Sequence, residues 1–215
     1  MTVSVPWPRL ARNLVAILRC LTPADVDAVG DVLVEAGFEA IEVPLNSPDP
    51  FASIERLAAR LPASVLVGAG TVLTAADAGR VADVGGRILV APNVDPLVIA
   101  AATARGMVTM PGVFTPTEAF QALAAGASAL KFFPAAALGA TGIAAVRAVL
   151  PKGTVIGAVG GVSEADFAAY AAAGVTAFGL GSSLYKPGAS AADVAARAAA
   201  AVRAYDDTFA SGAAR

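Results

Sequence analysis

Short apolar runs recur along the chain at intervals of roughly 21 to 26 residues, and segments of mixed polarity separate them. The runs are rich in valine, leucine, isoleucine and alanine, and this near-continuous apolar character is typical of strands that are buried on both faces. Eight strands are therefore predicted, at residues 14–19, 40–45, 66–71, 87–92, 108–112, 129–134, 155–161 and 177–182.

The segments between these runs are rich in alanine and have the apolar spacing of helices. They include residues 24–37, 53–61, 75–85, 96–106, 116–126 and 164–174, and most end in the glycine expected just past a helix C-terminus. Four helix starts place a hydroxyl residue three positions before an acid, which predicts an N-terminal cap. The capping residues are Thr22, Thr74, Thr115 and Ser163.

Strand and helix thus alternate along the whole chain. Eight strand-helix units with apolar strands predict a parallel sheet covered by helices, and eight is the number that closes a (β/α)8 TIM barrel. An open doubly wound sheet is the alternative, but no GxGxxG follows the first strand to support it. No linker divides the chain, so we expect a single barrel domain over 1–215, with 1–13 as an N-terminal arm and 206–215 as a small-residue tail.

Composition narrows the class of protein. The chain has 215 residues, of which 57% are hydrophobic and 15% charged, and its formal net charge is −2. Glycine, proline and charged residues interrupt every apolar run, so we expect a soluble protein that does not enter the membrane. The near-neutral charge gives no basis for binding nucleic acid. A single cysteine and a start unlike a signal peptide favour the reducing cytoplasm.

The sequence contains no histidine. This excludes Ser-His-Asp and Cys-His catalysis and any histidine-ligated metal site, and we expect no metal and no cofactor. Cys20 is expected to be a small packed residue rather than a nucleophile, because no histidine is present to activate it.

Lys131 lies in an apolar segment, Ala-Leu-Lys-Phe-Phe-Pro at 129–134. Burying an unpaired ammonium costs several kcal/mol, so such a lysine loses its proton more easily than a solvated one. A neutral amine in a dry pocket is a nucleophile. The alternative is a snorkelling or salt-bridged lysine at a strand end.

Glu42 is the only acidic residue in the eight predicted strands. Burial raises the pKa of a carboxyl unless a cation balances it, and a carboxyl with a raised pKa suits a general acid/base. A structural ion pair with Arg19 or Lys131 is the competing explanation, and the two roles can coexist.

Other candidates lie where strands of the predicted barrel end, which is where barrel active sites are built. Arg19 has donors that suit a carboxylate or phosphate, although a plain surface arginine is nearly as consistent with its position. Thr71 can donate a hydrogen bond to a carboxylate or simply close a turn. Two glycine-containing loops, with Gly160 and Gly161 in one and Gly181 and Ser182 in the other, follow the last two strands, where barrels commonly bind phosphate. Plain turns are the alternative.

An amine nucleophile, a carboxylate, an arginine and a phosphate cradle are together the parts for covalent chemistry on a phosphorylated keto acid. A lysine imine with the C2 carbonyl is an electron sink, and the carboxylate can move the protons. This is the chemistry of a class I aldolase.

Seven short motifs then point to one family. They are Ile-Leu-Arg at 17–19, Glu-Val-Pro-Leu-Asn-Ser at 42–47, Gly-Ala-Gly-Thr-Val at 68–72, Pro-Gly at 111–112, Leu-Lys-Phe-Phe-Pro at 130–134, Val-Gly-Gly-Val at 159–162 and Gly-Leu-Gly-Ser at 179–182. In this order, over about residues 14–205, the chain resembles the KDPG/KDPGal aldolase family, and within it the branch that cleaves 2-dehydro-3-deoxy-6-phosphogalactonate.

The resemblance implies roles for particular residues. Lys131 would form the imine and Glu42 would be the general acid/base. Arg19 and Thr71 would hold the carboxylate end of pyruvate, and Phe133 would pack against the reacting centre. The residues implied in the phosphate site are Gly160, Gly161, Gly181 and Ser182.

The resemblance also implies the ligands and the assembly. The substrate would be a phosphorylated 2-keto-3-deoxy sugar acid, the products would be pyruvate and D-glyceraldehyde 3-phosphate, and the protein would be a homotrimer. The gluconate-preferring branch typically has a threonine where this chain has Val159, and an arginine close to where it has Asn46. Both departures favour the galactonate epimer.

Three other functions stay open from the sequence. The chain could be an aldolase for the gluconate epimer or one of broad specificity. It could be a non-catalytic phosphosugar-binding barrel. It could also be a carboxylate-based isomerase or a phosphate-binding synthase in which Lys131 is only a counter-ion.

Overall fold

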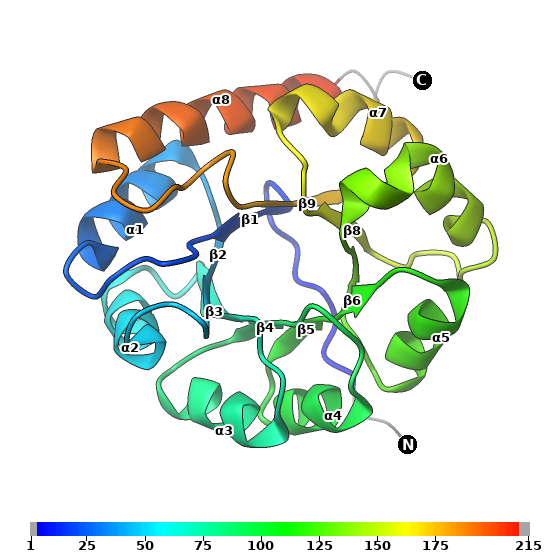
Figure 1. Cartoon of the computed structure of the whole chain (residues 1–215), viewed down its shortest axis with the longest axis horizontal. Coiled ribbons are helices and arrows are strands. Elements are labelled where there is room, and N and C mark those ends of the chain that lie inside the picture. Colours follow the sequence, from blue (N-terminus) through cyan, green and yellow to red (C-terminus); the bar gives the residue numbers. More distant parts are fainter. Residues whose placement is uncertain (1–3, 211–215) are drawn as a thin grey trace.

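The computed structural model describes residues 4–210, and its strands form an inner ring that the helices surround (Figure 1). The strands are β1 (Leu14–Ile17), β2 (Ala40–Pro44), β3 (Leu66–Gly70), β4 (Ile88–Val90), β5 (Val108–Met110), β6 (Gly112–Val113), β7 (Leu130–Phe132), β8 (Ile156–Val159) and β9 (Ala177–Leu180). All paired strands are parallel, in the order β5-β4-β3-β2-β1-β9-β8-β7-β6. The predicted α/β barrel is confirmed.

The fold differs from the predicted eight strands at one place. The expected strand 108–112 is divided at Pro111 into β5, which pairs with β4, and β6, which pairs with β7. Proline has no N–H to donate to a ladder, which explains the break. The Pro111 carbonyl still accepts a hydrogen bond of 2.9 Å from the Lys131 N–H. The chain therefore closes the ring by passing from one edge of the sheet to the other at Pro111.

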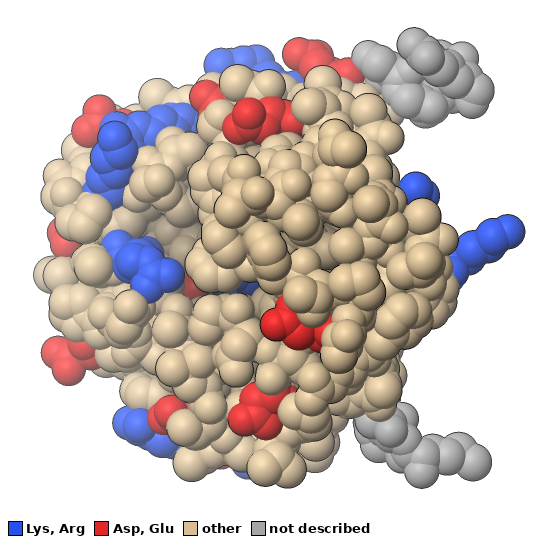
Figure 2. All heavy atoms as spheres, turned by 45° about the vertical axis from the view of Figure 1, so that its right-hand side comes forward, with Lys and Arg blue, Asp and Glu red and all other residues tan. Residues whose placement is uncertain are grey.

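Helices follow the strands around the ring. They are α1 (Val26–Ala36), α2 (Pro50–Arg60), α3 (Ala75–Asp83), α4 (Pro96–Ala104), α5 (Pro116–Ala124), α6 (Ala135–Arg147), η1 (Glu164–Asp166), which is a short 3-10 helix, α7 (Phe167–Ala172) and α8 (Ala191–Ala210). No helix within residues 4–210 is long and apolar enough to cross a bilayer. On the face in Figure 2, acidic and basic side chains are interspersed among wide uncharged areas.

The predicted caps fit their helices with one exception. Thr74 caps α3 and Thr115 forms a capping box with Glu118 at α5. The Ser163 N–H donates to the Asp166 carboxylate at η1. Thr22, by contrast, does not cap α1. The helix begins at Val26, and the Thr22 hydroxyl instead donates to the Asp25 carboxylate at 2.8 Å in a turn that precedes it.

The C-terminal tail differs from the prediction, and the N-terminal arm has contacts that were not predicted. Helix α8 continues to Ala210, so the first half of the expected tail at 206–215 is helical, and the remainder lies outside the described residues. In the arm, the Trp7 indole donates to the Asn13 side chain at 2.9 Å, and Trp7 packs against the apolar residues inside the ring. Figure 1 shows the arm crossing the interior of the ring.

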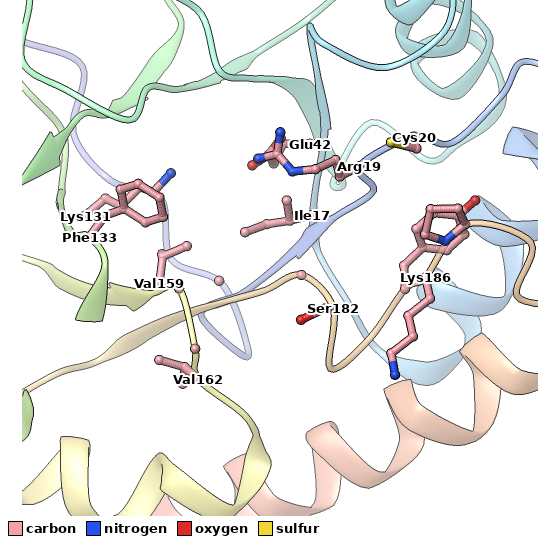
Figure 3. Close-up of a pocket in the computed structure, with 16 residues that line it drawn as sticks. Ile17, Arg19, Cys20, Glu42, Lys131, Phe133, Val159, Val162, Ser182 and Lys186 are labelled. Carbon is pink, nitrogen blue, oxygen red and sulfur yellow. The ribbon is translucent and has the colours of Figure 1, made fainter. Parts of the chain in front are cut away.

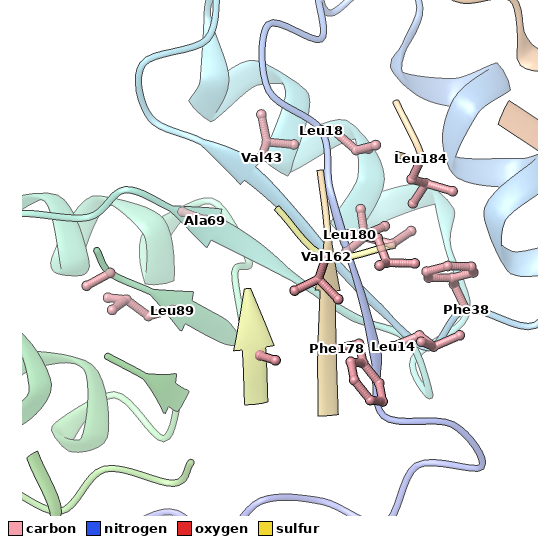
Figure 4. Close-up of a cluster of buried hydrophobic side chains, with 14 of the residues drawn as sticks. Leu14, Leu18, Phe38, Val43, Ala69, Leu89, Val162, Phe178, Leu180 and Leu184 are labelled. Carbon is pink, nitrogen blue, oxygen red and sulfur yellow. The ribbon is translucent and has the colours of Figure 1, made fainter. Parts of the chain in front are cut away.

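The period-two alternation of the strands divides the core into two parts. One residue set, which includes Leu14, Ile41 and Leu130, packs between the sheet and the helices (Figure 4). The alternate set, which includes Val15 and Ala129, fills the inside of the ring. Because side chains alternate along a strand, residues 42 and 131 belong to the inner set. The two charged residues of the strands therefore lie inside the barrel.

Candidate active site

A cavity of about 380 Å³ opens where the strands end (Figure 3). Loops after β1, β8 and β9 and side chains from β2 and β7 build its wall. Its lining residues are Ile17, Arg19, Cys20, Glu42, Lys131, Phe133, Val159, Gly160, Gly161, Val162, Gly179, Gly181, Ser182, Tyr185, Lys186 and Pro187. The structure thus brings nine of the ten predicted site residues around one space.

Lys131 reaches this cavity from β7 and is 6% exposed. Burial lowers the pKa of its ammonium group. The charge of Glu42 opposes that change, and the charge of Arg19 adds to it. The Nζ atom lies 4.5 Å from the centre of the Phe133 ring. The environment therefore favours the neutral, nucleophilic amine more than water does.

Glu42 faces the cavity from β2 and is 2% exposed. Its carboxylate lies against Gly70 of β3, where a Cβ atom would overlap it. Within the described residues, Oε2 has no hydrogen-bond partner. Desolvation raises the pKa of Glu42 to about 7, even though Lys131 and Arg19 oppose the change. A carboxyl with this pKa can both take and give a proton near neutral pH.

The charged groups of the cavity interact without pairing. Within residues 4–210, no ion pair of 4.0 Å or less joins Glu42 to Lys131 or Arg19. A buried carboxylate and a buried ammonium without an ion-pair partner are costly to a fold. Their arrangement therefore favours a catalytic role over a static ion pair.

Arg19 stands two residues past β1 and is exposed toward the cavity. Its Nη1 donates to the Asn46 side-chain oxygen at 2.6 Å, which leaves other guanidinium N–H groups for a ligand. Next to it, the Cys20 N–H donates to the Ser47 hydroxyl at 2.9 Å. These two hydrogen bonds join the loop after β1 to the loop after β2, and so hold the backbone at Arg19 in place.

Thr71 is the one predicted site residue that does not line the cavity. It follows β3 in a left-handed conformation with φ of 55°, and it is half-buried. It follows Gly70, the residue against which the Glu42 carboxylate lies. A role for Thr71 in binding stays a prediction.

Gly160 and Gly161 follow β8 with φ values of 90° and 72°. A Cβ atom at Gly160 would lie 3.0 Å from the Phe133 ring, and one at Gly161 would lie 2.6 Å from the Ala136 Cβ. Glycine is therefore required for both backbone shape and space. Backbone N–H groups in such a loop are suited to bind an anion. Gly181 and Ser182 line the same cavity from the loop after β9.

Seven lining residues were not predicted from the sequence. They are Ile17, Cys20, Val162, Gly179, Tyr185, Lys186 and Pro187. The apolar ones resemble any strand residue in sequence, so no local signal marks them. Lys186, a lysine four residues after Ser182, could have been found from its place in the last strand-helix unit.

The expectation that Cys20 is a packed residue is wrong, because Cys20 is exposed and has a φ of 65°. It lines the cavity beside Arg19. Within residues 4–210, no group of three or more histidine, cysteine, aspartate or glutamate side chains is placed to hold a metal ion.

Comparisons with known proteins agree with this geometry. Residues 9–200 match the family model described as KDPG and KHG aldolase. A probable 2-dehydro-3-deoxy-6-phosphogalactonate aldolase of Rhizobium meliloti (strain 1021) is 62% identical over 205 residues, which cover 95% of this chain and 97% of the relative. The 2-dehydro-3-deoxy-6-phosphogalactonate aldolase of Escherichia coli (strain K12) is 44% identical over 192 residues, 89% of this chain and 94% of the relative. A solved structure described as native KDPGal has a TM-score of 0.93 and 42% identity, covering 95% of this chain and 99% of the other.

Proposed function

The chain belongs to the KDPG and KHG aldolase family, and on this premise we propose that it cleaves 2-dehydro-3-deoxy-6-phosphogalactonate reversibly to pyruvate and D-glyceraldehyde 3-phosphate. It is an aldolase and hence a carbon–carbon lyase. One observation carries the mechanism: Lys131 and Glu42 are buried, neither forms an ion pair within residues 4–210, and both face the same cavity.

Lys131 begins the reaction as a nucleophile. Its neutral amine adds to the C2 carbonyl of the substrate, and loss of water gives the protonated imine. Glu42, directly or through a water, takes the proton of the C4 hydroxyl. The C3–C4 bonding electrons then move to the imine nitrogen, which leaves an enamine on Lys131 and releases the aldehyde.

Glu42 completes the cycle by returning the proton. The enamine is protonated at C3, and water hydrolyses the resulting imine to pyruvate and the free amine. Both directions need a carboxyl that is ionised in one step and protonated in another, and a pKa of about 7 suits both states.

The two ends of the substrate have separate partners. Arg19 and Thr71 bind the carboxylate end, and Phe133 packs against the reacting carbons. The phosphate is bound by the two loops that follow β8 and β9, through Gly160, Gly161, Gly181 and Ser182. The cavity of about 380 Å³ is large enough for a single sugar-acid phosphate.

Val159 supports the choice of epimer. It lines the cavity from β8, as does Ile17 from β1. Both side chains lie close to Gly179, where a Cβ atom would be 2.7 Å from Val159 Cγ2 and 3.1 Å from Ile17 Cδ1. This apolar wall offers no hydrogen bond to a C4 hydroxyl. Selection between the epimers then rests on shape, and we expect it to be modest.

We also propose that the protein acts as a homotrimer in the cytoplasm. Four exposed apolar side chains come from neighbouring units of the barrel: Leu73 after β3, Leu97 in α4, Phe114 after β6 and Phe120 in α5. Leu97 alone is 73% exposed. Apolar residues grouped in this way are typical of a surface that another subunit covers. The unpaired Cys20 supports a reducing compartment.

Cleavage of the two epimers tests the proposed function. Purified protein is mixed with the galactonate or the gluconate form of the 2-dehydro-3-deoxy-6-phospho sugar acid, and pyruvate is followed by its reduction with lactate dehydrogenase. We expect pyruvate from both, with the higher kcat/KM for the galactonate form. A higher value for the gluconate form would reassign the substrate, and no pyruvate from either would contradict the proposed function.

A further inference from the structure

The cavity contains a third basic residue to which the mechanism above gives no role. Its ionisable lysine and arginine residues are Arg19, Lys131 and Lys186, and its only carboxyl is Glu42. Arg19 is hydrogen-bonded to Asn46 and is assigned to the substrate carboxylate, and Lys131 forms the imine. Lys186 remains, at the end of the cavity farther from Lys131 in Figure 3.

The loops assigned to the phosphate supply hydrogen bonds but no full positive charge. Gly160, Gly161, Gly181 and Ser182 offer backbone N–H groups and one hydroxyl. A phosphate monoester carries about −1.5 to −2 charges at pH 7. Burying that charge against dipoles alone leaves most of it without a compensating cation, so a lysine near these loops has a clear electrostatic use.

The turn after β9 places Lys186 near these loops. The Leu184 and Tyr185 N–H groups both donate to the Gly181 carbonyl, at 2.9 and 2.8 Å, which makes one helical turn. Lys186 comes directly after this turn, and it lines the same cavity as Ser182. Figure 3 shows both residues on the segment that borders the cavity.

Lys186 is anchored by its backbone and free at its side chain. Its carbonyl accepts a 2.9 Å hydrogen bond from the Ala189 N–H, and Pro187 restricts the backbone next to it. The side chain is exposed, and no acidic group within residues 4–210 lies within 4.0 Å of its ammonium. The long stem allows the ammonium to turn over the opening without a competing ion pair.

We propose that Lys186 is a specificity-determining residue that selects phosphorylated substrates by pairing with the phosphate group. This rests on the proposed function, since it gives that reaction its preference for a phosphorylated aldehyde. Lys186 contacts the phosphate and takes no part in proton transfer. Together with Arg19, its charge also draws the anionic substrate toward the cavity.

Condensation of pyruvate with two aldehydes tests this role. Glyceraldehyde 3-phosphate and D-glyceraldehyde differ only in the phosphate. We expect Lys186→Ala to lower kcat/KM for glyceraldehyde 3-phosphate by about 10- to 100-fold, mainly through KM, and to change the value for D-glyceraldehyde far less. Lys186→Arg should retain most of the preference. Lys152→Ala removes a lysine outside the cavity and should leave the preference unchanged.

Binding of inorganic phosphate, measured by calorimetry, keeps the proposal independent of turnover. We expect weaker phosphate binding in Lys186→Ala than in the wild type, with the same pyruvate adduct formed on borohydride treatment. An unchanged preference between the aldehydes together with unchanged phosphate affinity would overturn the role of Lys186. A wild type that forms no pyruvate adduct and no condensation product would instead overturn the proposed function.

Discussion

Glu42 lies in an environment that does not suit a carboxylate. Its side chain is buried against Gly70, and its Oε2 atom has no hydrogen-bond partner within the described residues. The cations that act on it, Lys131 and Arg19, are too far away for an ion pair. Such an arrangement lowers the stability of the ionised form. A fold that keeps it gains a carboxyl that changes its protonation state near neutral pH.

This cost predicts how Glu42→Gln changes stability with pH. Folding raises the pKa of Glu42 from 4.5 to about 7, so between these values the folded state binds more protons than the unfolded state. The contribution of the raised pKa to the free energy of unfolding is therefore fully present below pH 4.5, falls as pH rises, and is lost above about pH 7. Relative to wild type, Glu42→Gln should gain up to about 3 kcal/mol between pH 4.5 and 8.

Urea unfolding of both proteins across this pH range measures the difference, and the variant should also be slow in imine formation and cleavage. A free-energy difference that does not change with pH would mean that Glu42 titrates normally. An unchanged rate would reassign Glu42 to structure.

Cys20 allows a second test at the scale of one residue. It is the only cysteine of the chain, it is exposed, and it lines the cavity beside Arg19. Alkylation with iodoacetamide should therefore lower turnover several-fold by crowding the substrate, and substrate should slow the alkylation. Cys20→Ser should resist the reagent. Full activity of protein that mass spectrometry shows to be alkylated would place the substrate elsewhere.

At the scale of the strand, Gly70 in β3 makes room for Glu42 in β2. The two residues sit on paired parallel strands, and a methyl group at Gly70 would overlap the carboxylate. We expect Gly70→Ala to lower the free energy of unfolding by about 1–3 kcal/mol and to reduce kcat, because the carboxylate must move.

Gly79→Ala in α3 is the matched control. A Cβ atom there meets nothing within 4 Å, and alanine favours a helix more than glycine does, so stability should rise by about 0.5–1 kcal/mol. The midpoints of thermal unfolding of the two variants are compared with that of the wild type. If both substitutions stabilise the protein, the carboxylate is not held where the structure places it.

The strands and the two charged residues within them could be predicted from the sequence, because apolar runs recur regularly and a charge inside such a run stands out. The eight apolar runs predict a barrel, and the isolated charges of Glu42 and Lys131 within those runs mark them as site residues. Turn geometry was harder to predict. The turn that precedes Lys186 depends on hydrogen bonds to the Gly181 carbonyl within its own loop. Cys20 has a left-handed backbone, and its N–H donates to Ser47 of another loop. No sequence pattern marks either feature.

The break at Pro111 shows the same limit at the scale of an element. The run 108–112 reads as one strand, and only closure of the ring decides that its two halves pair with different neighbours. Thr22 is a similar case, because its motif matches a cap while the first helical residue lies farther along.

For the whole molecule, the exposed apolar residues of α4 and α5 are where we expect the subunits of the proposed trimer to meet. We expect light scattering to give about three times the mass of a single chain. Replacing Leu97 and Phe120 together by glutamate should shift the protein toward the monomer, because charge at an apolar contact between subunits is costly. Val149→Glu, a change at an exposed valine outside this group, should leave the trimer intact. A wild type that runs as a monomer would contradict the proposed assembly.

The central claim is that Lys131 forms an imine with pyruvate, and reduction of that imine tests it most directly. The protein is treated with borohydride in the presence of pyruvate, and the adduct is located by intact mass and peptide mapping. We predict one reduced pyruvate adduct per chain, on Lys131, and none in Lys131→Met, a variant that keeps the volume of the side chain without its amine. A folded wild type without an adduct, or an adduct on Lys152 or Lys186 instead, would contradict the account.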